Sequence, residues 1–460
     1  MDLLPFKRMS RRFVHSRLDT PGGNAHEPGM AAETSHGRAA SAGDVFRIAS
    51  GNFLEMYDFM VFGYFAAAIG QAYFPAGDAA SGLLKSLATF GAGFLMRPLG
   101  ALVLGAFTDR HGRRAGLLLT LALMSVGIVT LTVTPGYATI GVLAPILVLG
   151  GRLIQGFSAG AELGNVSVYL AEIAPPGQTG FYVSWQSASQ QVAVIVAALV
   201  GVALSFVLGP AQLAAWGWRL PLGLGCMLVP LLFVLRRHLR ESDAFEKRAA
   251  PDSIATIARH LWVARGIVLA GLGLVLMTTV SFYMITAYTP TFGKILHLPE
   301  QANLLVTAGV GASNLLWLPV MGALSDRIGR TPILIACTVL MMLTAYPAMA
   351  WLTVHPSVLR LIAVELWLSA LYASYNSAMV VYLTEIVPPA VRASGFSLAY
   401  SLATAVGGFT PFIVTWLITA TGNRAVPGLW LTAAAAISLA AVVATGRSQR
   451  RASLQNGGER

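Results

Sequence analysis

The sequence contains few charged residues. Asp, Glu, Lys and Arg make up 11% of its 460 residues, whereas hydrophobic residues make up 55%. Soluble domains contain about 25% charged residues. Apolar runs of about 18 or more residues recur along the chain, and each can cross a hydrocarbon core about 30 Å thick. The composition therefore excludes a soluble globular protein and indicates a helical protein that spans the membrane many times.

Cysteine is also scarce. The two cysteines, Cys226 and Cys337, both fall in apolar runs, so no disulfide framework or metal site is implied. The sequence also lacks a His/Glu cluster with metal-ligand spacing, a Walker loop and a nucleophile elbow. We therefore expect no metal and no cofactor. A membrane-embedded enzyme and an ATP-driven transporter are both disfavoured.

The apolar runs predict twelve membrane-spanning helices. Their expected ranges are 44–71, 81–107, 115–134, 139–171, 178–208, 217–236, 262–291, 300–324, 331–351, 357–387, 392–418 and 427–446. If both chain ends lie in the cytoplasm, 24 of the 31 Lys and Arg residues fall in cytoplasmic segments, as the positive-inside rule requires. The net charge of +11 is therefore interpreted as a topology signal and not as a sign of nucleic-acid binding.

Two short motifs each occur twice. GAFTDRHGRR (105–114) matches GALSDRIGR (322–330), and YLAEIAPP (169–176) matches YLTEIVPP (382–389). The two offsets, 217 and 213 residues, are nearly equal, which indicates a duplicated six-helix unit. Parallel repeats of this kind place a binding site between them, near the membrane midplane.

The repeat divides the chain into two halves. We expect a disordered cytoplasmic tail (1–43), an N-terminal half (44–236), a charged cytoplasmic linker (237–261), a C-terminal half (262–446) and a short cytoplasmic tail (447–460). The first tail has a basic start but no apolar core, so it does not read as a secretory signal. Its Gly, Pro, Ser and Ala content is typical of disorder.

These motifs resemble those of the major facilitator superfamily, whose loop signature is similar to GAFTDRHGRR. SGNFLEMYDF (50–59), GRLIQGFSAGAELG (151–164) and GWRLPL (217–222) resemble the metabolite–proton symporter family. SWQSASQQVA (184–193) most resembles bacterial citrate–proton symporters and their tricarballylate-transporting relatives. The resemblance covers about residues 44–446. It implies an all-α major facilitator fold with twelve transmembrane helices in two six-helix halves related by pseudo-two-fold symmetry.

The resemblance implies a proton-coupled symporter that imports a tricarboxylate, citrate or tricarballylate, by alternating access. It implies a monomer in the bacterial cytoplasmic (inner) membrane whose partners are the substrate, protons and lipid, with no nucleic acid. A dicarboxylate or a betaine-like osmolyte is the alternative substrate. The short C-terminal tail lacks the heptad segment of the osmolyte-transporting branch. A channel is disfavoured because it would not need a duplicated gate.

Ionisable residues inside apolar spans are costly to bury and are therefore functional candidates. The first span holds Glu55 and Asp58, and the fourth holds Arg152 and Glu162. A buried carboxylate beside an arginine can bind and release a proton as its surroundings change. By resemblance, Asp58 and Arg152 form the proton-coupling pair, and a static ion pair between two helices is the alternative. Glu365, in the tenth span, is either a second proton site or a residue of the outer interface.

An anionic substrate with three carboxyl groups needs cationic and neutral hydrogen-bond donors. Arg97 and Arg152 are the predicted cationic ligands, although Arg97 could instead brace the bend at Pro98. The amides and hydroxyls of SWQSASQQ either line the substrate site or join helices. The other predicted substrate-binding residues are Asn52, Gln155, Gln186, Ser189, Gln190, Tyr283, Tyr288, Asn314, Tyr375 and Asn376.

The repeated loop motifs indicate a gate. We expect Gly105 and Gly322 to permit close helix contact, and Gly112 and Gly329 to permit tight turns. By resemblance, the aspartate of each motif engages a helix N-terminus of the other half or a neighbouring arginine, which the helix dipole favours. The glutamates of the YLxEI repeats pair with loop arginines. The predicted gating residues are Gly105, Asp109, Arg110, Arg113, Glu172, Asp326, Arg330 and Glu385.

Overall fold

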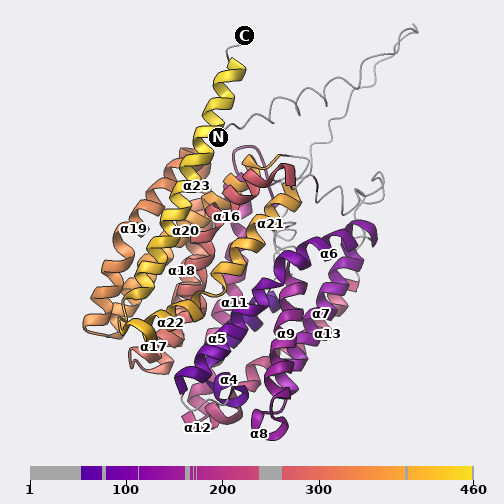
Figure 1. Ribbon diagram of the computed structural model, residues 1–460, viewed down its shortest axis with the longest axis vertical. Helices are drawn as coiled ribbons and strands as arrows, with labels where there is room; N and C mark the ends of the chain where they lie inside the picture. Colours follow the sequence, from indigo (N-terminus) through magenta and orange to yellow (C-terminus); the bar gives the residue numbers. More distant parts are fainter. Residues whose placement is uncertain are drawn as a thin grey trace. The chain divides into compact units, whose positions relative to one another are not determined.

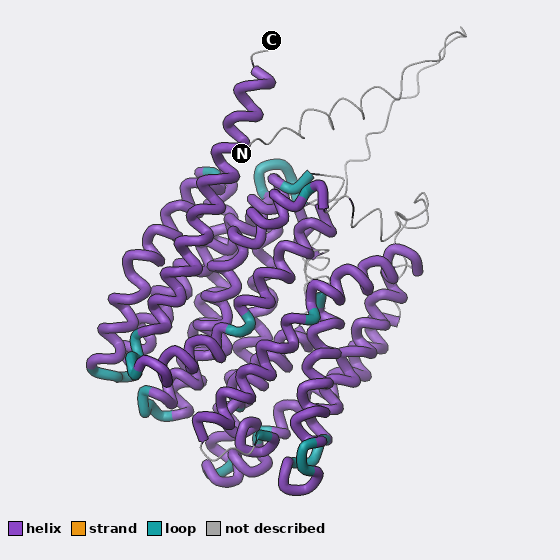
Figure 2. Tube along the Cα trace, viewed as in Figure 1, coloured by secondary structure: helices purple, strands orange, loops and turns teal. Residues whose placement is uncertain are grey.

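Every regular element in the described part of the chain is a helix (Figure 2). The computed structural model describes residues 53–74, 79–111, 113–160, 166–168, 170–171, 174–237, 259, 262–388 and 392–457. Residues Ala39–Arg460 belong to one compact unit. The all-α class expected from the sequence is therefore confirmed.

The helices before residue 238 are called the first helix group. They are α3 (Phe53–Tyr64), α4 (Ala66–Tyr73), α5 (Ala79–Leu95), α6 (Arg97–His111), α7 (Arg113–Val133), α8 (Tyr137–Ile140), α9 (Leu143–Ala159), α11 (Thr179–Val207), α12 (Pro210–Gln212), the π-helical turn η2 (Leu213–Gly217) and α13 (Arg219–Arg237). Figure 1 shows the long helices of this group, coloured from indigo to pink, running alongside one another.

The helices from residue 262 onward are called the second helix group. They are α16 (Arg265–Phe282), the π-helical segment η3 (Tyr283–Tyr288), α17 (Thr289–Ile295), α18 (Glu300–Ile328), α19 (Arg330–Val354), α20 (Val358–Ile386), α21 (Arg392–Gly407), α22 (Thr410–Thr421) and α23 (Val426–Gly457). Helix α18 of this group packs along α11 of the first group.

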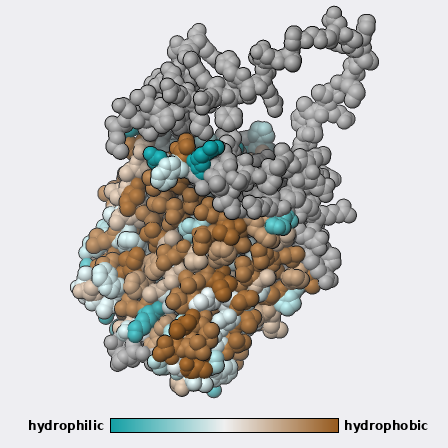
Figure 3. Space-filling view, turned by 45° about the vertical axis from the view of Figure 1, so that its right-hand side comes forward, coloured by the Kyte–Doolittle hydropathy of each residue, from teal (hydrophilic) through white to brown (hydrophobic). Residues whose placement is uncertain are grey.

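The helices account for the expected membrane spans. In the described residues, eight helical stretches are long and apolar enough to cross a membrane, and α3 with α4, bent by 72°, can form one more. The remaining three expected spans correspond to the shorter apolar helices Leu118–Val133, Leu143–Ala159 and Arg219–Pro230. Apolar side chains cover much of the described surface in Figure 3, and many large ones are exposed. Such a surface suits contact with lipid.

Three spans change their helix geometry just before a proline. The break between α5 and α6 precedes Pro98, η3 precedes Pro290, and the break between α21 and α22 precedes Pro411. Proline lacks the N–H that continues a helix. Inside a membrane, such irregular backbone is tolerated where protein buries it or where it lines a cavity. The breaks therefore point to the interior region where a site is expected.

Glycines bring the two helix groups together. A Cβ on Gly322 of α18 would collide with the carbonyl oxygen of Gly180 of α11, and the reverse is also true. Toward the opposite end of the helices, a Cβ on Gly63 of α3 would lie 3.1 Å from the carbonyl oxygen of Ala287 in η3. The two groups therefore contact each other at both ends.

Among the described residues, the close contacts of α6 do not involve Gly105. A Cβ at Gly105 would meet no atom of the described residues within 4 Å. Close contact of α6 with α9 occurs earlier, where Gly100 meets the carbonyl oxygen of Phe157. The expectation for Gly322 is confirmed, and Gly329 has φ of 88° at the turn between α18 and α19. Gly112 lies outside the described residues.

Replacing Gly322 by alanine should weaken the α11–α18 contact. The added methyl group collides with Gly180, so the helices must separate, at a cost of about 1–3 kcal/mol. Gly309→Ala on the same helix is the control, because a Cβ there meets no described atom within 4 Å. Thermal unfolding in detergent should show a lower Tm for Gly322→Ala alone. Equal Tm values for the two variants would contradict this account.

Candidate functional site

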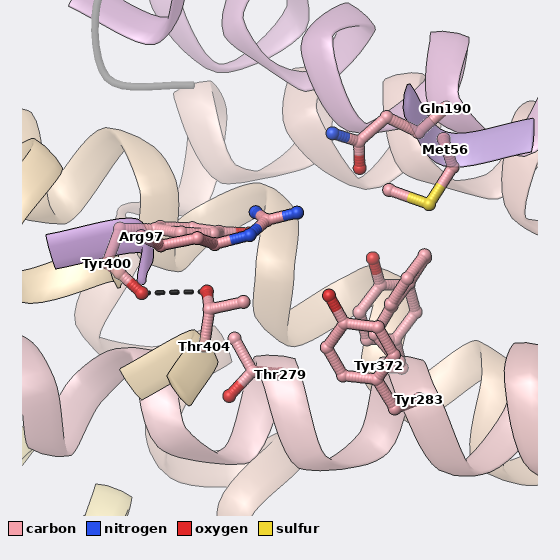
Figure 4. A pocket seen from close by; sticks show the side chains of 9 residues that line it. Met56, Arg97, Gln190, Thr279, Tyr283, Tyr372, Tyr400 and Thr404 are labelled. Carbon is pink, nitrogen blue, oxygen red and sulfur yellow. Dashed lines mark hydrogen bonds between the residues drawn. The ribbon is translucent and has the colours of Figure 1, made fainter. Parts of the chain in front are cut away.

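A buried pocket lies between the two helix groups. Its lining residues are Met56, Arg97 and Gln190 from the first group, and Thr279, Phe282, Tyr283, Tyr372, Tyr400 and Thr404 from the second. Figure 4 shows the Arg97 guanidinium, the Gln190 amide and the hydroxyls of Tyr283 and Tyr372 around one common space. Arg97 is the charged member of this lining. The pocket therefore offers one cation and several neutral hydrogen-bond donors.

Arg97 lies at the break between α5 and α6, and its side chain is 2% exposed. Its Nη2 donates a hydrogen bond to Glu55 Oε1, which forms a buried ion pair. The guanidinium carbon also lies 4.9 Å from the ring centre of Phe94 and 5.3 Å from that of Phe59. A carboxylate and aromatic faces together offset the cost of burying a guanidinium. Arg97 is thus held as a positive charge in the pocket wall.

A second buried pair lies beside the first. Arg152 Nη1 donates to Asp58 Oδ2 and to Gln155 Oε1, each at 2.8 Å. The Arg152 guanidinium lies 3.9 Å from the ring centre of Phe62 and 5.2 Å from that of Phe59. Phe59 therefore contacts the guanidinium groups of both pairs. Arg152 and Gln155 were predicted substrate ligands, but Arg152 is engaged with Asp58 and Gln155 with Arg152, and neither lines the pocket.

The polar stripe SWQSASQQ serves two purposes in the structure. Gln190 lines the pocket. The adjacent Gln191 accepts a hydrogen bond from Asn314 Nδ2 at 3.4 Å, and Asn314 Oδ1 accepts one from Ser369 Oγ at 2.7 Å. This fully buried chain links α11 to α18 and α20 across the two helix groups. Asn314, a predicted substrate ligand, is therefore engaged between helices.

Several other predicted ligands do not line the pocket. These are Gln186, Ser189, Tyr288, Tyr375 and Asn376. The Tyr375 hydroxyl donates to the carbonyl oxygen of Leu274 at 2.7 Å, and the Tyr288 hydroxyl accepts from Thr415 at 2.9 Å. The hydroxyls of Tyr375 and Tyr288 therefore bond to neighbouring helices. Asn52 and Glu162 lie outside the described residues.

The predicted substrate-binding set lacks six residues of the lining. They are Met56, Thr279, Phe282, Tyr372, Tyr400 and Thr404. Tyr372 and Tyr400 do carry a signal, because each brings a hydroxyl into an apolar span. The signal is weak, since Tyr375 on the same helix brings its hydroxyl to a backbone carbonyl instead.

A cluster of charges joins the helix groups at the end where α18 meets α19. The Asp326 carboxylate accepts hydrogen bonds from the backbone N–H of Gly180 at 2.8 Å and of Phe181 at 3.0 Å, in the first turn of α11. A carboxylate is stabilised at such a helix N-terminus. Arg330 pairs with Asp326 at 2.7 Å and with Glu385 at 3.4 Å. The side chains of the first-repeat residues lie outside the described part; these are Asp109, Arg110, Arg113 and Glu172.

Comparisons with known proteins identify the family. Residues 45–256 match the family described as Sugar (and other) transporter, and residues 299–460 match the Major Facilitator Superfamily. The chain is 53% identical over 410 residues to a citrate-proton symporter of Salmonella typhi. The aligned residues cover 88% of this chain and 94% of that protein. The chain belongs to the major facilitator superfamily. It is also 54% identical over 404 residues to a citrate-proton symporter of Klebsiella pneumoniae, covering 87% and 91% of the two chains.

The fold agrees with this membership. The crystal structure of a D-xylose-proton symporter superposes with a TM-score of 0.70 at 18% sequence identity, covering 87% of this chain and 96% of that chain. The major facilitator fold expected from the sequence is thereby confirmed. Membership in the superfamily and the apolar helices together make the protein a multi-pass transporter of the bacterial inner membrane and not an enzyme.

Replacing Asn314 by alanine should destabilise the link between the helix groups. The change leaves the buried groups of Gln191 and Ser369 without this partner, at a cost of about 1–3 kcal/mol. Gln191→Ala and the double variant complete a thermodynamic cycle. Because the two amides share a bond, the double variant should lose less stability than the sum of the single losses. Strictly additive losses, measured by unfolding in detergent, would argue against the link.

Proposed function

We propose that this protein is a proton-coupled symporter that imports a tricarboxylate, citrate or tricarballylate, by alternating access. The observation that carries the proposal is the pocket between the helix groups, in which one buried arginine faces neutral amide and hydroxyl donors. The high identity to two citrate-proton symporters supports the substrate class. We also propose that the protein acts as a monomer, with the proton as its coupling ion and no other cofactor.

Arg97 would bind one carboxylate of the substrate, because a guanidinium can form two parallel hydrogen bonds with a carboxylate. The Gln190 amide and the hydroxyls of Tyr283 and Tyr372 can donate to the other carboxylates without the desolvation cost of further charges. A polar wall of this kind suits a substrate with several carboxyl groups and a hydroxyl. It suits a betaine-like osmolyte less well, because a quaternary ammonium accepts no such bonds.

The ion pair of Arg97 with Glu55 supplies a coupling mechanism. Substrate and Glu55 compete for the same guanidinium, because Glu55 is bonded to Arg97 in this structure. A proton that neutralises Glu55 weakens its hold on Arg97, so that the substrate carboxylate can take its place. Proton binding and substrate binding therefore favour each other, which is the thermodynamic requirement of symport.

Asp58 and Arg152 form the second proton-sensitive element. They are 1% and 0% exposed and do not line the pocket, so they must act through the helices that carry them. Asp58 and Glu55 lie three residues apart on α3, on adjoining turns of the helix surface. Protonation of Asp58 would release α9 from α3 and allow α3 to shift at the pocket wall.

The Asp326 cluster is the proposed gate at the cytoplasmic end. The positive-inside rule places this end, with Arg327 and Arg330, in the cytoplasm together with both termini. While Asp326 holds the first turn of α11, the helix groups are joined there and substrate cannot leave. Rocking of the N-terminal half (44–236) against the C-terminal half (262–446) would break these bonds and open the pocket inward.

The proposal predicts citrate accumulation driven by protons. In proteoliposomes with an inward proton gradient, labelled citrate should accumulate, and a protonophore should abolish the accumulation. Asp58→Asn should lose the accumulation yet retain citrate counterflow, because exchange requires no net proton movement. Glu300→Gln, at a partly exposed ion pair with Lys294, is the control and should behave as the wild type. If the wild type takes up neither citrate nor tricarballylate in a gradient-dependent manner, the tricarboxylate function is wrong; uptake of a dicarboxylate or betaine would identify the alternative.

Arg97→Lys should raise the KM for citrate by about tenfold or more. Lysine keeps the charge but cannot form the paired hydrogen bonds of a guanidinium, and about 1.4 kcal/mol of lost binding is a factor of ten. Arg219→Lys is the matched control, since Arg219 donates to Tyr73 at 3.4 Å and to the carbonyl oxygen of Thr134 at 3.3 Å, outside the pocket lining. Initial uptake rates give both KM values. An unchanged KM in Arg97→Lys would remove Arg97 from the substrate site.

A further inference from the structure

One buried carboxyl group has no part in the function proposed so far. Glu365 of α20 is 1% exposed. Its Oε1 lies 3.0 Å from the hydroxyl oxygen of Thr289, and its Oε2 has no hydrogen-bond partner among the described residues. The sequence left open whether Glu365 binds a proton or lies at the outer interface. Its burial excludes the interface.

The cations at this end of α20 are engaged elsewhere. Lys294 of α17 pairs with Glu300 of α18 at 2.9 Å. Arg360 of α20 donates to the carbonyl oxygen of Trp351 of α19 at 2.9 Å. The other titratable or charged side chains at this end of the second helix group include Tyr288, His297, Tyr346, His355 and Arg424. Burial without a paired cation favours the neutral carboxylic acid over the carboxylate.

The surroundings of Thr289 suit both protonation states of Glu365. The Thr289 hydroxyl lies 3.0 Å from Glu365 Oε1 and 2.9 Å from the carbonyl oxygen of Ile285. A hydroxyl has one proton, so it can donate to only one of these oxygens at a time. If Glu365 is ionised, Thr289 donates to the carboxylate. If Glu365 is protonated, the acid donates to Thr289, which then donates to Ile285.

Thr289, whose hydrogen bonding depends on the proton of Glu365, lies where the helix of the seventh span is irregular. Thr289 is the first residue of α17, directly after the π-helical segment η3 and before Pro290. The π-helical geometry and the proline both disturb the regular hydrogen bonding of the helix. The proton on Glu365 therefore decides whether the Thr289 hydroxyl binds α20 or its own span at this junction.

The junction is close to the substrate pocket along both helices. Glu365 precedes the pocket residue Tyr372 by seven residues, which is about 10 Å along α20. On the seventh span, η3 connects Thr289 to the pocket residue Tyr283. Glu365 lies on the side of the pocket away from the gate, because Glu385, at the other end of α20, contacts Arg330.

We propose that Glu365 is a second proton-binding site of the transport cycle and that its proton crosses the membrane together with the substrate. The proposal rests on the symport function proposed above. The proton enters from water on the outer side, binds the Glu365 carboxylate, and returns to water on the cytoplasmic side, where the carboxylate is restored. Each tricarboxylate is then accompanied by one proton more than Glu55 and Asp58 would carry alone.

Glu365→Gln tests the proposal because it keeps the size and hydrogen bonding of the side chain but cannot bind a proton. In proteoliposomes held at zero membrane potential, the citrate gradient that balances a known pH gradient gives the number of protons per citrate. The variant should carry one proton fewer than the wild type. Glu300→Gln, an outer carboxylate at the same end, should keep the wild-type ratio. An unchanged ratio in Glu365→Gln would overturn the proposal.

A second variant covers the case in which Glu365→Gln is inactive in counterflow. Thr289→Val removes the hydroxyl that donates to the ionised carboxylate, so a bound proton should persist to higher pH. The pH profile of citrate uptake should therefore shift upward, while Thr289→Ser, which keeps the hydroxyl, should retain the wild-type profile. Identical profiles for Thr289→Val and the wild type would refute a proton on Glu365. Failure of gradient-driven uptake in the wild type would instead refute the symport function itself.

Discussion

The arrangement of the site depends on two arginine–carboxylate pairs buried beside Phe59. Removal of one partner from such a pair costs about 3–5 kcal/mol, because the other charge is left buried and uncompensated. The pairs therefore hold α3, which supplies both carboxylates, against α6 and α9. Their guanidinium groups must stay near Phe59, and this requirement places Arg97 in the pocket wall and keeps Arg152 behind it.

The same pairs can respond to protons, which makes them more than structural supports. In a membrane interior, a charge that loses its partner cannot be compensated by water as it would be at a protein surface. Neutralisation of a carboxylate must therefore be followed by a rearrangement, either the arrival of an anionic substrate or a movement of the helices. This links the energetic cost of burial directly to the coupling that a symporter needs.

Much of the fold could be predicted from the sequence, because the thickness of a membrane fixes the length of an apolar run. The repeated motifs also indicated which charges meet, and Arg330 does lie against Asp326 and Glu385.

The pocket lining was harder to predict. Gln190 lines the pocket while the adjacent Gln191 bonds to Asn314, because each residue turns by about 100° around the helix and the rotation of α11 is set by packing against other helices. Likewise, the sequence does not single out Gly100 as the place where α6 approaches α9, since the crossing point of two helices depends on their tilt.

The charge of the pocket is distributed unequally between the two helix groups. Arg97 belongs to the first group, whereas the second group contributes hydroxyl groups and apolar surface to the lining. Hydroxyl contacts can be exchanged for water at little cost, but an anion leaves a guanidinium only against a charge-assisted bond. As the groups separate, the bound anion would detach first from the second group and last from Arg97. The first helix group would then determine the residence time of the cargo, and the second would determine when water reaches it.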